Sequence, residues 1–151
     1  MKLQQSTRLA LYSLLEFAAD PQRQISAAEI AQKYAVSSHH LAKVLAELAR
    51  VGMVQSVRGV GGGYRFIGNA KRLTLMDVIS RFEDVLPPER LPSNATPVGQ
   101  ALTAVLSEID EIAKASMSSI TLATMLGIIA RQQAVTPVLT SSKGIARRPT
   151  D

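Results

Sequence analysis

The chain has 151 residues, 46% of them hydrophobic and none of them cysteine. This is enough for one compact core with an appendage, and the lack of cysteine excludes disulfides, thiolate-ligated zinc or iron–sulfur sites and a cysteine nucleophile. Residues 1–72 contain ten Lys or Arg against four Asp or Glu, residues 73–133 four against seven and residues 134–151 three against one, so the net charges are +6, −3 and +2; a basic first half favours a polyanionic partner.

No segment has the pattern of a membrane span or of a signal peptide. The longest apolar stretch, near residues 122–130, is too short to cross a bilayer, and residues 1–5 are polar almost from the start. We therefore expect a cytoplasmic protein with no membrane partner.

The first part of the chain predicts two helices separated by a break. Residues 9–18 place apolar side chains at helical spacing, and Pro21 then prevents the helix from continuing. Ser26 and Glu29 have the spacing of a capping box, which predicts a second helix over residues 27–34.

A third helix is predicted over residues 38–51, because apolar residues recur at every third or fourth position and Gly52 follows as a C-terminal cap. The face opposite the apolar stripe is free to touch a partner. Small or polar side chains in the first turn of such a helix can approach base edges and exchange hydrogen bonds with them. We expect contacts with DNA from Ser38, His39, His40, Lys43 and Arg50.

A β-hairpin follows, because two short β-prone runs, residues 53–57 and 64–67, flank a glycine-rich segment. A cation at the tip can enter a narrow minor groove, where the negative potential is concentrated. Glycines beside it allow the backbone to approach phosphate. The residues of this hairpin that we expect to contact DNA are Arg58, Gly59, Gly61 and Tyr64.

Thr74 and Asp77 repeat the capping spacing, which predicts a fourth helix over residues 75–83 that packs back on the first core and completes it. Four prolines make residues 86–97 a non-helical connector. A helix of about 20 residues then carries a narrow apolar seam, and a last helix follows it. Because the first core is already complete, we expect the seam to join two copies of the chain through Leu102, Val105, Leu106, Ile109, Ile112 and Ala113.

Two helices joined by a short turn and followed by a hairpin are the elements of a winged helix-turn-helix domain. We therefore expect a mainly α fold with four parts: a winged helix-turn-helix DNA-binding domain with a small β-hairpin wing (1–85), a connector (86–97), a long dimerisation helix with a shorter companion (98–133) and a disordered basic tail (134–151). The third helix would enter the major groove of double-stranded DNA, and a homodimer would match two half-sites.

Other chemistries find little support. The Gly-x-Gly-x-x-Gly spacing that begins at Gly59 fails because Tyr64 takes the last glycine position, and the segment does not precede a helix. His39 and His40 are adjacent and share no helix face well enough to bind a metal together. The chain also lacks a catalytic constellation of serine, histidine or paired carboxylates. We expect no enzyme activity, no cofactor and no metal.

The string from Ser56 to Tyr64 after the helix-turn-helix resembles the wing of the Rrf family of winged-helix transcriptional regulators, which includes the IscR and NsrR types. The resemblance extends from Leu3 to about Leu126 and includes the segments Thr74–Ile79 and Ile120–Leu122. It implies a dimeric repressor or activator whose long helix crosses its twin and whose third helix reads DNA.

The chain departs from that family in its connector. Sensing members of the family place three cysteines there, before the long helix, to hold an iron–sulfur cluster, whereas residues 86–104 contain none. The resemblance places the last of these cysteines near Gln100 and a further ligand used by some members near Thr103, and neither residue is a thiol or an imidazole. Three explanations stay open: a constitutive DNA binder, a different small-molecule effector, or control by a protein partner. An alternative to regulation is a protein-docking module with only non-specific affinity for DNA.

Overall fold

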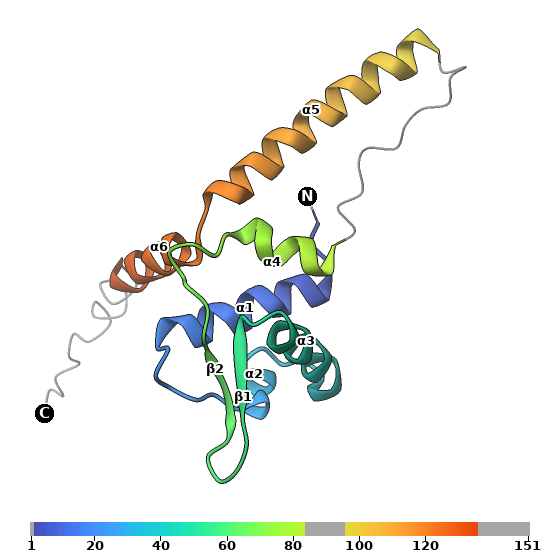
Figure 1. Cartoon of the computed structure of the whole chain (residues 1–151). Helices are drawn as coiled ribbons and strands as arrows, with labels where there is room; N and C mark the ends of the chain where they lie inside the picture. The colour runs from blue at the N-terminus through green and yellow to red at the C-terminus, as the bar shows by residue number, and fades with distance from the viewer. Residues whose placement is uncertain (1, 84–95, 136–151) are drawn as a thin grey trace, which may run out of the picture.

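The computed structural model describes residues 2–83 and 96–135 and confirms a mainly helical winged-helix fold with a two-stranded antiparallel wing (Figure 1). Its elements follow in the order α1 (Gln5–Ala19), α2 (Ala27–Lys33), α3 (Ser38–Arg50), β1 (Val54–Val57), β2 (Gly63–Phe66), α4 (Leu75–Phe82), α5 (Pro97–Ser119) and α6 (Leu122–Val135).

Helix α1 lies at the centre of the core, and it begins four residues earlier than the apolar spacing predicts. Its buried face includes Leu14 and Phe17, which are fully inaccessible to solvent. The extra turn has a tertiary cause: the Glu83 carboxylate, after the end of α4, accepts hydrogen bonds from the Thr7 hydroxyl (2.5 Å) and from the Gln4 backbone N–H (2.7 Å). These two bonds, led by that from Thr7, hold the pKa of Glu83 below its ordinary value.

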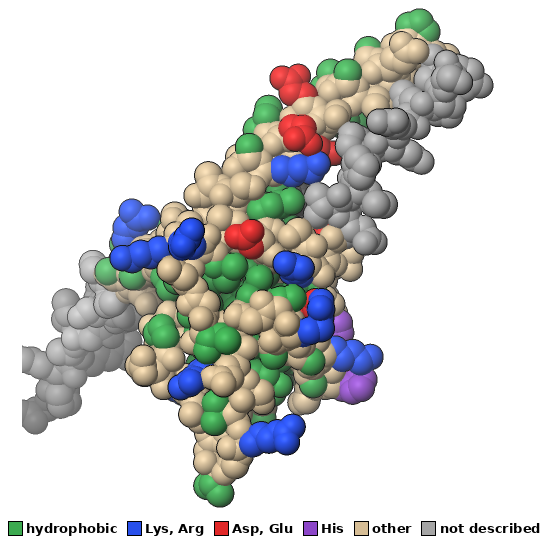
Figure 2. All heavy atoms as spheres, viewed as in Figure 1, with side chains coloured by type: hydrophobic (Ala, Val, Ile, Leu, Met, Phe, Trp, Pro, Cys, Tyr) green, Lys and Arg blue, Asp and Glu red, His purple; other side chains and the backbone are tan. Residues whose placement is uncertain are grey.

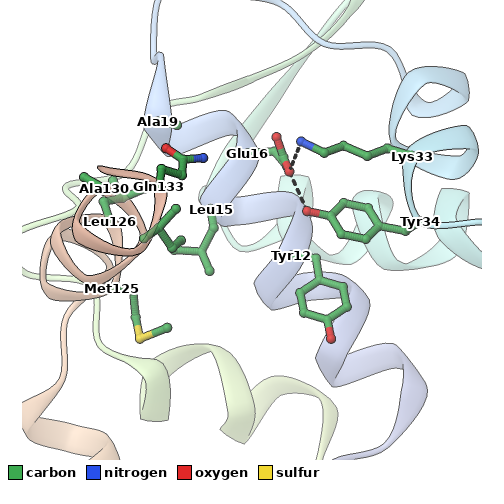
Figure 3. A pocket seen from close by; sticks show the side chains of 11 residues that line it. Tyr12, Leu15, Glu16, Ala19, Lys33, Tyr34, Met125, Leu126, Ala130 and Gln133 are labelled. Carbon is green, nitrogen blue, oxygen red and sulfur yellow. Dashed lines mark hydrogen bonds and ion pairs between the residues drawn. The ribbon is translucent and has the colours of Figure 1, made fainter. Parts of the chain in front are cut away.

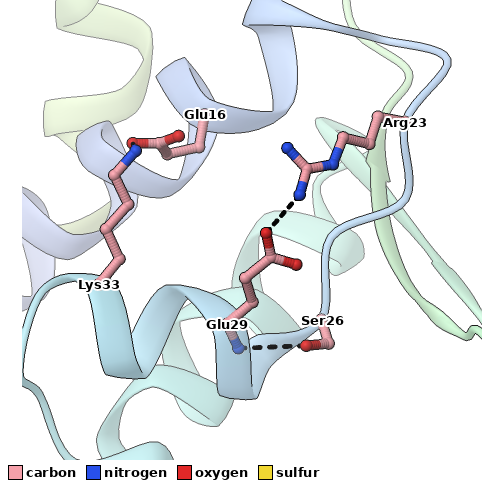
Figure 4. Close-up of polar contacts among 5 residues, drawn as sticks. All are labelled: Glu16, Arg23, Ser26, Glu29 and Lys33. Atoms are coloured by element: carbon pink, nitrogen blue, oxygen red, sulfur yellow. Dashed lines mark hydrogen bonds and ion pairs between the residues drawn. The ribbon is translucent and has the colours of Figure 1, made fainter.

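The helix-turn-helix is built from two capped helices. The Ser26 hydroxyl accepts from the Glu29 backbone N–H (3.1 Å), as predicted, but the Glu29 carboxylate binds Arg23 (Figure 4), so the reciprocal half of the predicted capping box is replaced by an ion pair. Helix α2 ends where Ala35 adopts a left-handed φ of 51° and the Val36 N–H donates to the Ala31 carbonyl (3.0 Å). This reversal brings α3 across the core.

The wing is a hairpin in which Val54 pairs with Phe66 and Val57 pairs with Gly63. A third segment joins it, because Ile25 and Tyr64 exchange backbone hydrogen bonds of 3.0 and 2.8 Å. A side chain at Gly63 would place its Cβ 2.6 Å from the Ile25 carbonyl oxygen, so only glycine permits this approach. The pairing fixes the wing to the segment that precedes α2.

The start of α4 pairs with the junction between α5 and α6. The Leu75 N–H donates to the Ile120 carbonyl and the Leu122 N–H donates to the Leu73 carbonyl, both over 2.9 Å. The Leu122 side chain is fully buried in the core. The expectation that the core is complete by Glu83 is therefore wrong: the second half of the chain contributes to it, because α6 returns to pack on α1.

Helix α5 projects away from the rest of the molecule, as Figure 1 shows, and none of its residues is buried. It begins at Pro97, so the predicted end of the connector at residue 97 is wrong by one residue. The fixed φ of proline suits the first position of a helix, and the Thr96 hydroxyl caps the helix by accepting from the Gly99 N–H (3.2 Å). The rest of the predicted connector, apart from Thr96, and the tail beyond Val135 lie outside the described residues.

The Thr74 capping box provides a test of the fold. Its hydroxyl accepts from the Asp77 N–H (3.2 Å) while the Asp77 carboxylate accepts from the Thr74 N–H (2.8 Å). We expect Thr74→Ala to lower the free energy of unfolding by about 1 kcal/mol, measured by urea denaturation. Ser80→Ala, on the exposed side of the same helix, is the control and should change it by less than about 0.5 kcal/mol. Equal effects of the two substitutions would contradict a specific role for the cap.

Candidate nucleic-acid interface

Helix α3 presents the polar face that its sequence predicts. Four apolar side chains anchor its inner face in the core, Leu41, Val44, Leu45 and Leu48. His39 and Lys43 lie one turn apart on the outer face and are exposed, as is Ser38 in the first turn. The Ser37 hydroxyl caps the helix by accepting from the His40 N–H (3.4 Å). The first turn therefore combines free donors with the positive end of the helix dipole, which suits an anionic partner.

Two of the predicted contact residues on α3 are engaged within the protein. The His40 Nε2 lies 3.2 Å from the Ser6 hydroxyl of α1 and is half-buried. The Arg50 guanidinium donates to both Glu47 carboxylate oxygens, over 2.8 and 2.5 Å. This hydrogen bonding lowers the pKa of Glu47 and raises the pKa of Arg50. Arg50 must share or leave Glu47 to contact a phosphate, so His39 and Lys43 are the better-placed residues.

Arg58 is exposed at the tip of the wing, near two glycines whose backbone conformation favours glycine over any other residue. Gly59 has a φ of 107° and Gly61 a φ of 73°, and a residue with a side chain would be strained in either conformation. The Gly62 N–H donates to the Gly59 carbonyl (2.9 Å), which closes the turn. The wing can therefore bring its backbone close to a partner surface.

Sequence reasoning missed a second cation on the wing. Arg65 lies on β2 with an exposed side chain, and its guanidinium donates to the Gln55 amide oxygen of β1 over 3.2 and 2.9 Å. This residue could have been found from the sequence, because successive side chains of a strand point to opposite faces of the sheet. Phe66 is buried, so the neighbouring Arg65 points to the exposed face. Tyr64 by contrast packs against the core, with its ring centroid 6.2 Å from that of Phe17.

Positively and negatively charged side chains are concentrated on different parts of the molecule. Figure 2 shows the histidines of α3 beside Lys and Arg side chains on one face, whereas Asp and Glu side chains gather along α5. No group of three or more His, Asp or Glu within residues 2–83 and 96–135 is placed to hold a metal ion, and no helix in this part is long and apolar enough to cross a membrane.

Helix α5 carries an uncovered apolar stripe, which we call the α5 seam. Its large members, which line the helix in Figure 2, keep 52–60% of their surface exposed, while Ala113 is half-buried; they are Leu102, Val105, Leu106, Ile109 and Ile112. Exposed stripes of this kind are typical of surfaces that bind another protein.

Comparison with known proteins agrees with this geometry. Residues 3–127 match the Rrf2 family, described as iron-dependent transcriptional regulators. The chain belongs to the Rrf2 family. It is thus a DNA-binding transcriptional regulator of the winged-helix type, which confirms the resemblance drawn from the wing and from the Thr74–Ile79 and Ile120–Leu122 segments.

Individual relatives give the same result. BadM of Rhodopseudomonas palustris, by its name an HTH-type transcriptional regulator, is 49% identical over 130 residues, which are 85% of this chain and 83% of BadM. NsrR of Shouchella clausii is 31% identical over 87 residues, 57% of this chain and 58% of NsrR. Among solved structures, CymR, the global cysteine regulator of B. subtilis, superposes with a TM-score of 0.73 at 26% identity, covering 85% of this chain and 98% of CymR.

The assigned face can be tested by removing its cations one at a time. We expect Lys43→Ala and Arg58→Ala each to weaken binding to operator DNA by about 1–3 kcal/mol if they read bases, or to lower the salt slope by about 0.9 if they contact phosphate. Fluorescence anisotropy at two salt concentrations measures both. Arg131→Ala on α6, which removes the same charge elsewhere, should bind like the parent. Parent-like binding by both test variants would place the DNA on another face.

Proposed function

We propose that this protein is a homodimeric transcriptional repressor that binds a roughly palindromic operator and works without the cysteine-ligated iron–sulfur sensor of its family. The observation that carries the proposal is the uncovered α5 seam on a chain whose other end presents an exposed basic reading helix.

Dimerisation follows from the cost of leaving the α5 seam in water. Each large side chain in it keeps 52–60% of its surface exposed, so covering the remainder gains about half of the roughly 1.5–3 kcal/mol of full burial, and nothing among the described residues covers it. A twofold axis through α5 would place the same stripe of each copy against the other, because such an interface is self-complementary. Two reading helices related by that axis would then meet two half-sites of opposite orientation.

The loss of the sensor follows from the ligand chemistry. Iron–sulfur clusters in proteins are held mainly by cysteine thiolates, and the chain contains no cysteine. Gln100 and Thr103, near which the resemblance places cluster ligands, offer neither a thiol nor an imidazole. The residues present do not fit the usual cluster, which leaves a constitutive binder, a different small-molecule effector or control by a protein partner.

Of the two possible effects on transcription, repression requires fewer functions of this architecture than activation does. A dimer that occupies two half-sites blocks access to a promoter by occupancy alone, whereas activation requires a further surface that engages the transcription machinery. Most of the large exposed apolar side chains of the described residues lie on α5, where the dimer would use them.

The dimer is tested by placing a charge in the middle of the α5 seam. We expect Ile109→Asp to convert a dimer into a folded monomer, because the side chain is exposed within one chain and would be buried between two. Size-exclusion chromatography with light scattering measures the mass, and circular dichroism checks the helix content. Glu108→Ala, a neighbouring exposed substitution, should remain dimeric. A monomeric parent, or a dimeric Ile109→Asp variant, would remove the seam from the interface.

Specific binding is tested by anisotropy with DNA from upstream of the gene for this protein and with a scrambled fragment of equal length. We expect a preference of about 10³-fold or more for the native fragment. Equal, weak and strongly salt-dependent binding to both would instead favour the docking module. Fusing the preferred fragment to a reporter gene then gives the sign of regulation, because a repressor lowers reporter output and an activator raises it.

A further inference from the structure

A cavity of about 770 Å³ opens between α1, α2 and α6, on a different part of the molecule from the reading helix and the wing tip (Figure 3). One wall is apolar and comes from two helices, with Leu15 on α1 and Met125, Leu126 and Ile129 on α6. These side chains are half-buried, so part of their apolar surface still meets solvent. A ligand that filled the cavity would cover that surface and gain the corresponding hydrophobic free energy.

The opposite wall is aromatic and polar. Tyr12 and Tyr34 stack with ring centroids 4.9 Å apart and planes inclined by 16°. The Glu16 Oε1 accepts from the Tyr34 hydroxyl (2.5 Å) and pairs with the Lys33 Nζ (2.6 Å), as the dashed lines in Figure 3 show. Burial alone would raise the pKa of Glu16, but the hydrogen bonds from Lys33 and Tyr34 outweigh it and lower that pKa. The carboxylate therefore stays charged and keeps both partners in place.

The two charged groups differ in what they can still bind. The Lys33 ammonium carries three N–H donors, its side chain is 58% exposed, and Glu16 accepts one donor. Glu16 is more enclosed, at 24% exposed, and its Oε1 already has two donors. A ligand anion can thus join Lys33 without breaking its ion pair with Glu16.

We propose that this cavity binds a small organic acid, with its apolar body between α6 and the tyrosine pair and its acidic group on Lys33. A ligand in this cavity would contact both the helix-turn-helix domain, through α1 and α2, and the C-terminal part of the chain, through α6. Helix α2 is the first helix of the helix-turn-helix, and α6 continues from α5 through the Ile120–Leu122 junction. A ligand wedged between them changes how α6 sits on α1 and α2, and so biases the spacing of the two reading helices. This second step rests on the proposed dimeric function, while binding itself does not.

Binding is measured on the full chain in the absence of DNA, by isothermal titration calorimetry and by tyrosine emission. The chain has no tryptophan and only three tyrosines, two of which line the cavity, so its emission reports on this site. The probes are 3-phenylpropionate and octanoate, with 3-phenylpropionamide as the uncharged match. We expect both acids to bind, and 3-phenylpropionate to bind about tenfold or more tighter than its amide, because a charge-assisted hydrogen bond to Lys33 is lost in the amide.

Substitutions locate the site. Lys33→Met should remove the preference for the acid over the amide, and Ala130→Phe, which adds a ring to an exposed residue of the lining, should abolish binding of both. Gly127→Phe is the matched control on α6: its added side chain meets open space outside the lining, so binding should persist. No heat from either acid at millimolar concentration, equal affinity for acid and amide, or binding unaffected by Ala130→Phe would overturn the proposal.

The regulatory step has its own readout. Saturating 3-phenylpropionate should change the anisotropy-derived affinity of the parent for its operator at least threefold and leave that of Ala130→Phe unchanged. Ligand binding with an unchanged affinity for DNA would overturn the coupling but not the site. Absence of operator binding in all samples would overturn the proposed function, and the calorimetric result would stand by itself.

Discussion

The backbone hydrogen bonds between residues 73–75 and residues 120–122 hold the two halves of this protein together. They are two bonds of 2.9 Å, accompanied by the complete burial of Leu122; burying a leucine contributes about 1.5–3 kcal/mol. A further bond of 2.9 Å, from the Ala123 N–H to the Ala70 carbonyl, lies beside them, and α6 packs on α1. With α6 in this position, side chains of α1, α2 and α6 line the cavity, while the α5 seam stays exposed.

The same attachment explains why two separate segments of the family resemblance occur together. Thr74 caps α4 through its side chain, and its backbone pairs with Thr121 in the junction between α5 and α6. Glu83 performs a similar double role at the other end of α4, where its carboxylate fixes the first turn of α1. The short helix α4 is thereby tied at both ends to the elements around it.

The polar side chains of the DNA-binding face are held in place to different degrees. Glu47 orients Arg50 and Gln55 orients Arg65, whereas no side chain among the described residues orients the exposed cations Lys43 and Arg58. Oriented cations lose less side-chain entropy on binding, but a paired one must also give up part of its bond to its partner. For an Rrf2 regulator without cysteine, a cavity that joins α2 to α6 offers a physical route by which a signal could reach this face.

The features that could be predicted from the amino-acid sequence are those with a local cause. The Thr74–Asp77 capping box, the glycines at the wing tip and the apolar spacing of α3 depend on neighbours within a few residues, so each could be predicted from spacing and residue type. The remaining contacts depend on the tertiary structure, because they join residues far apart in the chain that periodicity does not relate. They are the packing of Tyr64 on Phe17, the contact of His40 with Ser6, the entry of Leu122 into the core and the assembly of Tyr12, Glu16, Lys33 and α6 around one cavity.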